Sequence, residues 1–251
     1  MNNQRQQQED AVMATIDERT LNMINRAIAE QQQSYRDAAQ DLDDWHCPSL
    51  DSQNFWRLLC SAAQAVMAKR GVYHPFVADD NNRAIIYEMW LYVTGSEKCK
   101  WNIHKGIFLG GKIGCGKTVL MQAFCEVLHM VSRRHIEMIP ASQLYARIQA
   151  DGLKYFASRP LFIDDLGRDQ AVVNDFGNKM RPVNDLITMR YETGARTFFT
   201  SNYQLSTLAV EYNAKGELIG YGNYICDRIR EMVNVVALPG NSRRERWEAE
   251  P

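Results

Sequence analysis

Residues 111–118 read Gly111-Lys112-Ile113-Gly114-Cys115-Gly116-Lys117-Thr118, and they follow the apolar run Ile107-Phe108-Leu109. This order matches the pattern G-x-x-x-x-G-K-[ST], a phosphate-binding loop between a strand and a helix. Its glycines let backbone N–H groups surround phosphate oxygens, Lys117 reaches the terminal phosphates, and the Thr118 hydroxyl can ligate Mg²⁺. The loop therefore predicts a site for a nucleoside triphosphate with Mg²⁺. A glycine-rich turn in an unrelated fold is the alternative for an isolated match.

A second motif lies downstream, where residues 161–167 read Leu161-Phe162-Ile163-Asp164-Asp165-Leu166-Gly167. A continuous apolar run is typical of a parallel strand buried on both faces, and open α/β sheets place ligand-binding residues at the carboxyl ends of strands. We expect Asp164 to lie on the metal side and Asp165 to orient or deprotonate the attacking water. The alternative is a simple turn, but finding both motifs in this order favours the site.

Two later segments add candidates. The strand 197–200 ends in Ser201-Asn202, which places the Asn202 amide at the same sheet edge as Asp164. Asn202 can position the water or sense the terminal phosphate, although a turn-forming Asn after a strand is common. In the helix expected at 223–232, Arg228 is the first choice and Arg230 the second for an arginine that stabilises phosphoryl transfer in a neighbouring subunit. The alternative for both is a solvated helix face.

Composition sets the limits of the function. The chain has 251 residues, of which 45% are hydrophobic, enough for one α/β domain and a smaller appendage. The formal net charge of −1 gives no overall attraction to nucleic acid or membrane. No apolar stretch reaches transmembrane length, so we expect a cytoplasmic protein. The cysteines lack zinc-ligand spacing, so no zinc is expected. Cys115 lies inside the phosphate loop, and we expect its alkylation to block nucleotide binding unless nucleotide is bound first.

The chain is expected to divide into a helical N-terminal partner-binding region, 1–75, and an ATPase domain, 76–251. Residues 1–60 carry ten acidic residues against five arginines, and an acidic helical arm favours a protein partner, with a solvated helix as the alternative. In the second part, strands alternate with helical segments, which predicts a parallel α/β sheet covered on both faces. The expected strands are Gly106–Leu109, Ile136–Ile139, Leu161–Asp164, Thr197–Thr200 and Val233–Leu238.

Taken together, these motifs resemble the DnaC/IstB branch of the AAA+ ATPases over about residues 76 to 244. The motifs are the phosphate loop, Leu-Phe-Ile-Asp-Asp-Leu-Gly, Thr-Ser-Asn, Asp-Arg-Ile-Arg-Glu-Met and the closing Gly-Asn-Ser-Arg-Arg. The resemblance implies a P-loop AAA+ core with a five-stranded parallel sheet, and ATP and Mg²⁺ at Gly111–Thr118 with Asp164. It further implies a sensor at Asn202, a trans-acting Arg228, and oligomeric work on DNA or on a replicative helicase. Too few residues follow Leu238 for a C-terminal helical lid.

Three functions follow from these features. The first is an ATP-dependent loader of a replicative DNA helicase, which hydrolyses ATP slowly in a homo-oligomer and contacts single-stranded DNA. The second is a transposition helper of the IstB kind, which binds duplex DNA and a transposase. The third is an interaction module gated by nucleotide with negligible hydrolysis, because Asp165 stands where faster AAA+ enzymes have a glutamate. Lys154, Arg159 and Arg168 can touch a nucleic-acid backbone, and isolated surface cations are the alternative.

Overall fold

The computed structural model describes residues 18–43, 45–169, 173–175, 178–216 and 219–243. The chain divides into two compact units, one ending at Asp44 and one beginning at Trp45. The described part of the first unit is a single helix, α2 (Glu18–Asp43). The part of the predicted helical region before residue 18 lies outside the described residues.

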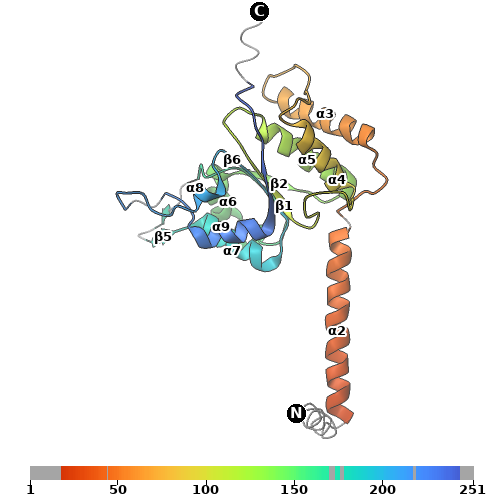
Figure 1. The fold of residues 1–251 in the computed structure, drawn as a ribbon. Helices are drawn as coiled ribbons and strands as arrows, with labels where there is room; N and C mark the ends of the chain where they lie inside the picture. The colour runs from red at the N-terminus through yellow and green to blue at the C-terminus, as the bar shows by residue number, and fades with distance from the viewer. Residues whose placement is uncertain (1–17, 44, 170–172, 176–177, 217–218, 244–251) are drawn as a thin grey trace, which may run out of the picture. The chain divides into compact units, whose positions relative to one another are not determined.

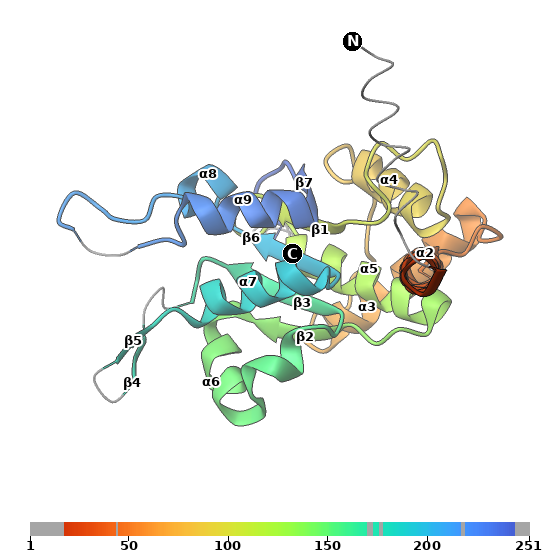
Figure 2. The same cartoon turned by 90° about the horizontal axis from the view of Figure 1, so that it is seen from below.

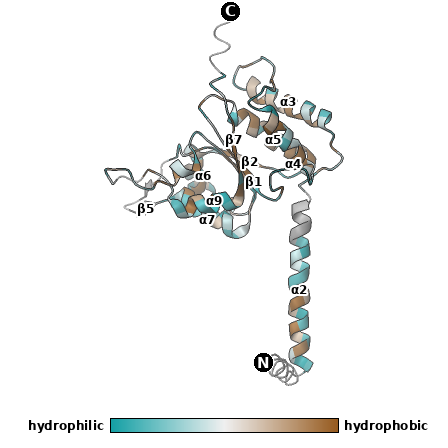
Figure 3. Cartoon of the chain, in the orientation of Figure 1, coloured by the Kyte–Doolittle hydropathy of each residue, from teal (hydrophilic) through white to brown (hydrophobic). Residues whose placement is uncertain are grey.

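Helix α2 is mostly polar and carries a narrow apolar stripe (Figure 3). Leu21, Ile24 and Ile28 follow one another at helical spacing, and each is 39–47% exposed. Side chains three and four positions apart share a helix face, so these residues form one line along α2. A stripe of this kind fits a helix that meets a partner along one face.

The second unit is built on a five-stranded sheet with the order β2-β3-β6-β1-β7 (Figure 1). Every pairing between neighbouring strands is parallel. The predicted fold class is confirmed, and each strand lies within one or two residues of its expected position. The bounds are β1 Gly106–Gly110, β2 Glu137–Pro140, β3 Leu161–Leu166, β6 Thr197–Ser201 and β7 Val233–Ala237.

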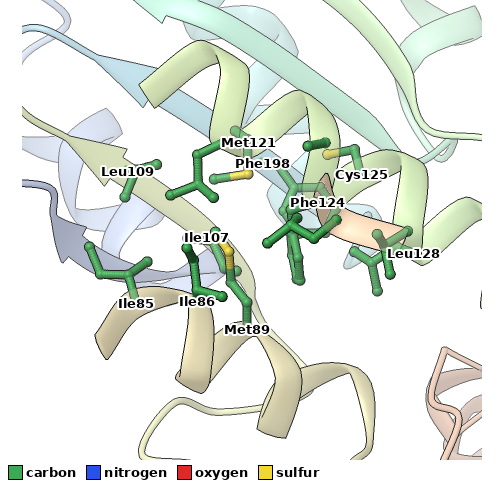
Figure 4. Packing of buried hydrophobic residues seen from close by; sticks show 14 of the residues in the cluster. Ile85, Ile86, Met89, Ile107, Leu109, Met121, Phe124, Cys125, Leu128 and Phe198 are labelled. Atoms are coloured by element: carbon green, nitrogen blue, oxygen red, sulfur yellow. The ribbon is translucent and has the colours of Figure 1, made fainter. Parts of the chain in front are cut away.

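Helices cover both faces of this sheet (Figure 2). Alternate side chains of a strand point to opposite faces, and β1 shows the result directly. Ile107 and Leu109 join a core formed with α3, α4 and α5, whereas Phe108 joins a core formed with α6, α7, α8 and α9. Figure 4 shows the first core, where side chains of α4 meet those of β1 and α5. The helices are α3 Ser52–Ala68, α4 Arg83–Val93, α5 Lys117–Ser132, α6 Ala141–Asp151, α7 Pro182–Thr193, α8 Leu205–Leu208 and α9 Asn223–Met232, with a 3-10 turn at Leu153–Phe156.

The compact unit extends farther toward the N-terminus than the expected boundary at residue 76. Phe55, Leu59 and Ala63 of α3 are almost fully buried in the same core as β1 and α5, so α3 is part of the sheet-bearing unit. Asp51 is the N-cap of α3, because its carboxylate accepts the N–H of Asn54 at 2.8 Å.

The sequence did not predict a short antiparallel hairpin, β4 (Val173–Asp175) with β5 (Asn178–Met180), which is inserted between β3 and α7. The described residues after β7, 238–243, contain no helix. Among the helices that the structure describes, none is both long and apolar enough to span a membrane.

Candidate nucleotide-binding site

The phosphate loop connects the end of β1 to the first residue of α5, as its sequence predicts. Gly114 and Gly116 have φ of 80° and 101°, left-handed values that L side chains rarely adopt. These two residues turn the chain into the helix, and the N-terminus of α5 therefore faces the loop. A helix N-terminus favours anions because its first N–H groups have no partner within the helix.

Lys117 lies across the loop rather than in solvent. Its side chain is buried, and Nζ donates to the carbonyl of Lys112 at 2.8 Å and to Oδ1 of Asn202 at 2.8 Å. The ammonium group therefore sits between the phosphate loop and the end of β6. This position joins two of the predicted site residues through one cation.

Asp164 meets the phosphate-loop helix at the end of β3. The Thr118 hydroxyl donates to Oδ1 of Asp164 at 2.9 Å, and the Thr200 hydroxyl donates to the same oxygen at 2.5 Å. Burial raises the pKa of the Asp164 carboxyl above its ordinary value, and the negative charge of neighbouring Asp165 raises it further. The hydrogen bonds from the Thr200 and Thr118 hydroxyls lower the same pKa and offset part of the rise. A partly buried carboxylate of this kind gains most from a cation.

The backbone bulges where the two carboxylates follow each other. Ile163 pairs with Phe199 and Leu166 with Ser201, so β3 has one residue more than β6 over this step. Asp165 takes up the extra length with φ of 58°, a value uncommon for a residue with a Cβ, and its N–H donates to the Thr200 hydroxyl at 2.9 Å. Bulges frequently redirect side chains beside active sites.

The bulge directs the Asp165 carboxylate toward Asn202 and Arg168. Asn202 Nδ2 donates to Oδ1 at 3.3 Å, and Arg168 Nη1 donates to Oδ2 at 3.2 Å. Asn202 thus contacts both Lys117 and Asp165, the two groups on either side of the expected terminal phosphate. The structure brings together Lys117, Thr118, Asp164, Asp165 and Asn202.

A magnesium ion suits the oxygen atoms present at this edge. Mg²⁺ is usually bound by one or two carboxylates together with phosphate oxygens and water. The Thr118 hydroxyl and the Asp164 carboxylate are hard oxygen donors in direct contact, and Asp165 adjoins them in sequence. The residues present therefore fit the metal that the loop sequence implies.

The two candidate arginines lie on α9, away from the contacts just described. The Arg228 guanidinium stacks between the rings of Tyr191 and Tyr224, at 4.9 and 4.2 Å from their centroids, and donates to the Tyr224 hydroxyl. Arg230 forms a long, exposed ion pair of 3.9 Å with Asp227. Neither of these arrangements brings an arginine to the phosphate loop of the same chain.

Several residues that shape the site escaped the sequence interpretation. Thr200 supports both carboxylates, but it was read only as the last residue of a strand. Tyr221 accepts the N–H of Gly167 at 2.9 Å and donates to Asp169, which anchors the turn after Asp165. A hydroxyl at the carboxyl end of a buried strand is the one signal by which the sequence could have identified Thr200. Tyr221 lies far from the motifs and gave no such signal.

The fold is a P-loop α/β core. No family model matches the chain, and no curated protein matches it in sequence. Among solved structures, DnaI is similar with a TM-score of 0.49 and 24% identity, over 67% of this chain and 87% of that one. The DnaC helicase loader has a TM-score of 0.48 and 22% identity, over 65% and 93%. AMPPCP-bound DnaA from Aquifex aeolicus has a TM-score of 0.46 and 15% identity, over 67% and 50%.

At these identities and TM-scores the likeness concerns the fold alone. The roles of individual residues rest on the contacts at the sheet edge.

Proposed function

We propose that the protein is an ATPase that binds ATP with Mg²⁺ at the phosphate loop. The hydrogen bond between Thr118 Oγ1 and Asp164 Oδ1, 2.9 Å long, carries this proposal, because it joins the start of α5 to the carboxyl end of β3. Lys117 neutralises the terminal phosphates, and Thr118 and Asp164 hold Mg²⁺. Bound Mg²⁺ supplies positive charge that stabilises charge on the transferred phosphoryl group.

Asp165 and Asn202 are proposed to act on the attacking water. Their side chains are in contact at 3.3 Å, and Asn202 also accepts a hydrogen bond from Lys117, so the amide links the Lys117 ammonium group to the Asp165 carboxylate. Asp165 orients the water and accepts its proton, while Asn202 positions the Asp165 carboxylate and the Lys117 ammonium group. Such acid–base assistance typically contributes about 10² to 10⁴ in rate.

Arg228 is proposed to complete the site of a neighbouring copy in a homo-oligomer. Its side chain is half-buried against two tyrosine rings, and its Nη2 donates to the Tyr224 hydroxyl. These contacts hold the guanidinium on α9, away from the phosphate loop of its own chain. Arginines supplied in this way are typically worth about 10³ to 10⁵ in rate.

A mixing experiment tests this assignment. Lys117→Ala should lose tight ATP binding, whereas Arg228→Ala should keep ATP binding and lose turnover in assembled protein. An equal mixture of the two inactive variants should regain turnover, because Lys117→Ala subunits supply Arg228 to intact loops. Arg230→Ala is the matched control and should behave as wild type. A mixture without activity, or weaker ATP binding by the Arg228→Ala monomer, contradicts the trans assignment.

We further propose that this ATPase loads a replicative DNA helicase and contacts single-stranded DNA. The motif set of the DnaC/IstB branch supports this function, and so does the exposed apolar stripe of Leu21, Ile24 and Ile28 on α2. The N-terminal unit, which ends at Asp44, would hold the helicase, and the sheet-bearing unit that begins at Trp45 would form the ATPase. Lys154, Arg159 and Arg168 are the candidate contacts to the nucleic-acid backbone.

Capture of the hexameric replicative helicase of the same genome tests the loader function. The full chain with Ile24→Asp and Ile28→Asp should lose the helicase, while Asn22→Asp, away from the stripe, should retain it. Binding of long duplex DNA with a steep salt dependence, and no capture of the helicase, would instead favour the transposition helper.

One observation favours a second candidate, a nucleotide-gated interaction module with negligible hydrolysis. The Asp165 carboxylate is engaged on both oxygens, by Asn202 and by Arg168. A shorter carboxylate held in this way reaches water less readily than a free glutamate. Steady-state turnover that is equal in wild type, Lys117→Ala and Arg228→Ala, with and without single-stranded DNA, would identify this function.

A further inference from the structure

A short segment after β7 lies along the outside of the phosphate loop. We call residues 238–243 the C-terminal strap. The Leu238 N–H donates to the carbonyl of Gly110 at 2.7 Å, and the Arg243 N–H donates to the carbonyl of Gly114 at 3.0 Å. Arg243 Nε donates to the carbonyl of Cys115 at 2.9 Å. The strap therefore follows the loop from its first turn to its tip.

The loop glycines fit the strap closely. A Cβ at Gly114 would lie 2.4 Å from Ser242 Oγ, and one at Gly111 would lie 2.5 Å from the Leu238 carbonyl oxygen. Both distances are shorter than real Cβ contacts. Gly111 and Gly114 are thus needed for two reasons: a side chain at either position would collide with the strap, and the loop must also fold closely around phosphate.

Arg243 also ties the loop to the segment before α4. Its Nη2 lies 2.9 Å from Oδ2 and 3.0 Å from Oδ1 of Asp79, and both side chains are more than two-thirds buried. Asp79 is itself fixed, because its Oδ1 accepts the N–H groups of Asn81 and Asn82 at 3.0 and 3.2 Å. The Arg243 guanidinium is therefore held on two sides, by the Asp79 carboxylate and by the Cys115 carbonyl.

The direction of these carbonyls matters for phosphate binding. In a trans peptide, the carbonyl of one residue and the N–H of the next point in opposite directions. Holding the carbonyls of Gly114 and Cys115 toward the strap turns the N–H groups of Cys115 and Gly116 to the opposite, phosphate-binding side. The Cys115 N–H donates to the Lys112 carbonyl at 3.4 Å, the same oxygen that Lys117 contacts, so it points into the loop and away from the strap.

We propose that Arg243 is a positioning residue for the phosphate loop. It fixes the loop carbonyls outward and so sets the N–H groups that bind phosphate, and its pair with Asp79 links this geometry to the start of α4. The proposal rests on the proposed nucleotide binding. By linkage, bound nucleotide should in turn hold the strap more firmly on the loop.

Cys115 offers a reporter of strap position that does not require catalysis. The residue is 1% exposed, and its Sγ lies 3.9 Å from the Leu238 carbonyl oxygen, under the strap. Loosening the strap should therefore expose the thiol to iodoacetamide. Mass spectrometry of the Cys115 peptide separates this thiol from the other five free cysteines.

The test compares full-length Arg243→Met and Arg243→Lys with wild type and with Arg83→Met, which removes an exposed ion pair to Asp80. Arg243→Met should weaken ATP binding about tenfold and speed Cys115 alkylation about tenfold, because charged hydrogen bonds to buried groups are lost. Turnover at saturating ATP should stay near the wild-type value. Arg243→Lys should fall between the two, and Arg83→Met should match wild type.

The outcomes separate this inference from the proposed function. If wild type binds no ATP, the proposed function fails, and the alkylation rates alone still test the strap. If wild type binds ATP and Arg243→Met binds it within about twofold, with Cys115 still protected, the inference is wrong. A fall in turnover at saturating ATP with unchanged affinity also overturns it, because Arg243 would then act on chemistry.

Discussion

At the scale of single residues, Asp164 combines two opposed demands. Its carboxylate is partly buried and adjoins a second carboxylate, which penalises its charge, yet the proposed metal site requires that charge. Thr118 and Thr200 each donate a hydrogen bond to Oδ1, which offsets part of the penalty. The residue is therefore arranged for function rather than for stability of the protein alone.

Replacing Asp164 with Asn should reveal this cost. Because burial raises the pKa of Asp164 above 3.8, the folded protein binds the proton more tightly than the unfolded chain, and the free energy of unfolding falls as pH rises through this window. Asp164→Asn keeps an oxygen for both threonines and removes the charge. Its melting temperature should exceed that of wild type by about 2–4 °C at neutral pH, and the difference should vanish below the window.

Melting curves recorded from about pH 3 to about pH 8 measure this effect. Asp164→Glu, which keeps the charge, is the control and should show no gain at neutral pH. A lower melting temperature for Asp164→Asn at neutral pH would contradict the account.

Arg168 affects Asp165 in another way. Its side chain is 64% exposed and contacts Oδ2 of Asp165 at 3.2 Å. Arg168→Ala should free the carboxylate and raise ATP turnover by up to about fivefold, the range expected from losing an exposed ion pair. Steady-state turnover of this variant beside Arg83→Ala measures the effect. Unchanged or lower turnover would show that the ion pair does not restrain Asp165.

At the scale of elements, the bulge between β3 and β6 decides where the carboxylates point. Thr200 satisfies the extra residue, because its hydroxyl accepts the Asp165 N–H and donates to Asp164. Thr200→Val should leave the Asp165 N–H without a partner and lower the free energy of unfolding by about 1–3 kcal/mol. Thr200→Ser keeps the hydroxyl and serves as the control. Urea titration compares the two variants, and equal midpoints would remove Thr200 from this role.

The sequence predicted the centre of the sheet well because β1, β3 and β6 are largely buried on both faces. Continuous apolar runs such as Ile107–Leu109 leave few alternatives to a parallel strand, and the loop motif fixed the order of β1 and α5. The carboxylates and Asn202 were placed at one edge by the rule that parallel strand ends meet. These predictions needed only local pattern and topology.

The remaining features depend on contacts between distant segments. Arg190 illustrates this, since an arginine at the end of a helix is ordinarily solvated, yet it is fully buried and donates to carbonyls of Arg159 and Arg196. The pairing of Arg243 with Asp79 and the anchoring of Gly167 by Tyr221 are of the same kind. No periodicity or spacing reports which two loops will meet.

At the scale of the whole molecule, the chain supplies one set of site residues at its own sheet edge and another on α9. Within one copy, Thr118 bonds to Asp164, and Asn202 bonds to both Lys117 and Asp165. Arg228 instead stacks on Tyr191 and Tyr224. With Arg228 in its proposed trans role, turnover, unlike ATP binding, depends on assembly, so specific activity should rise with protein concentration while ATP affinity stays constant.

The central claim is that ATP and Mg²⁺ are held between the phosphate loop and the end of β3. Isothermal titration with ATP, in Mg²⁺ and in EDTA, tests it most directly. Wild type should bind ATP more tightly with Mg²⁺, Lys117→Ala should lose tight binding in both buffers, and Asp164→Asn should bind ATP with no gain from Mg²⁺. ATP binding by Lys117→Ala equal to that of wild type, or a full Mg²⁺ effect in Asp164→Asn, would contradict the account.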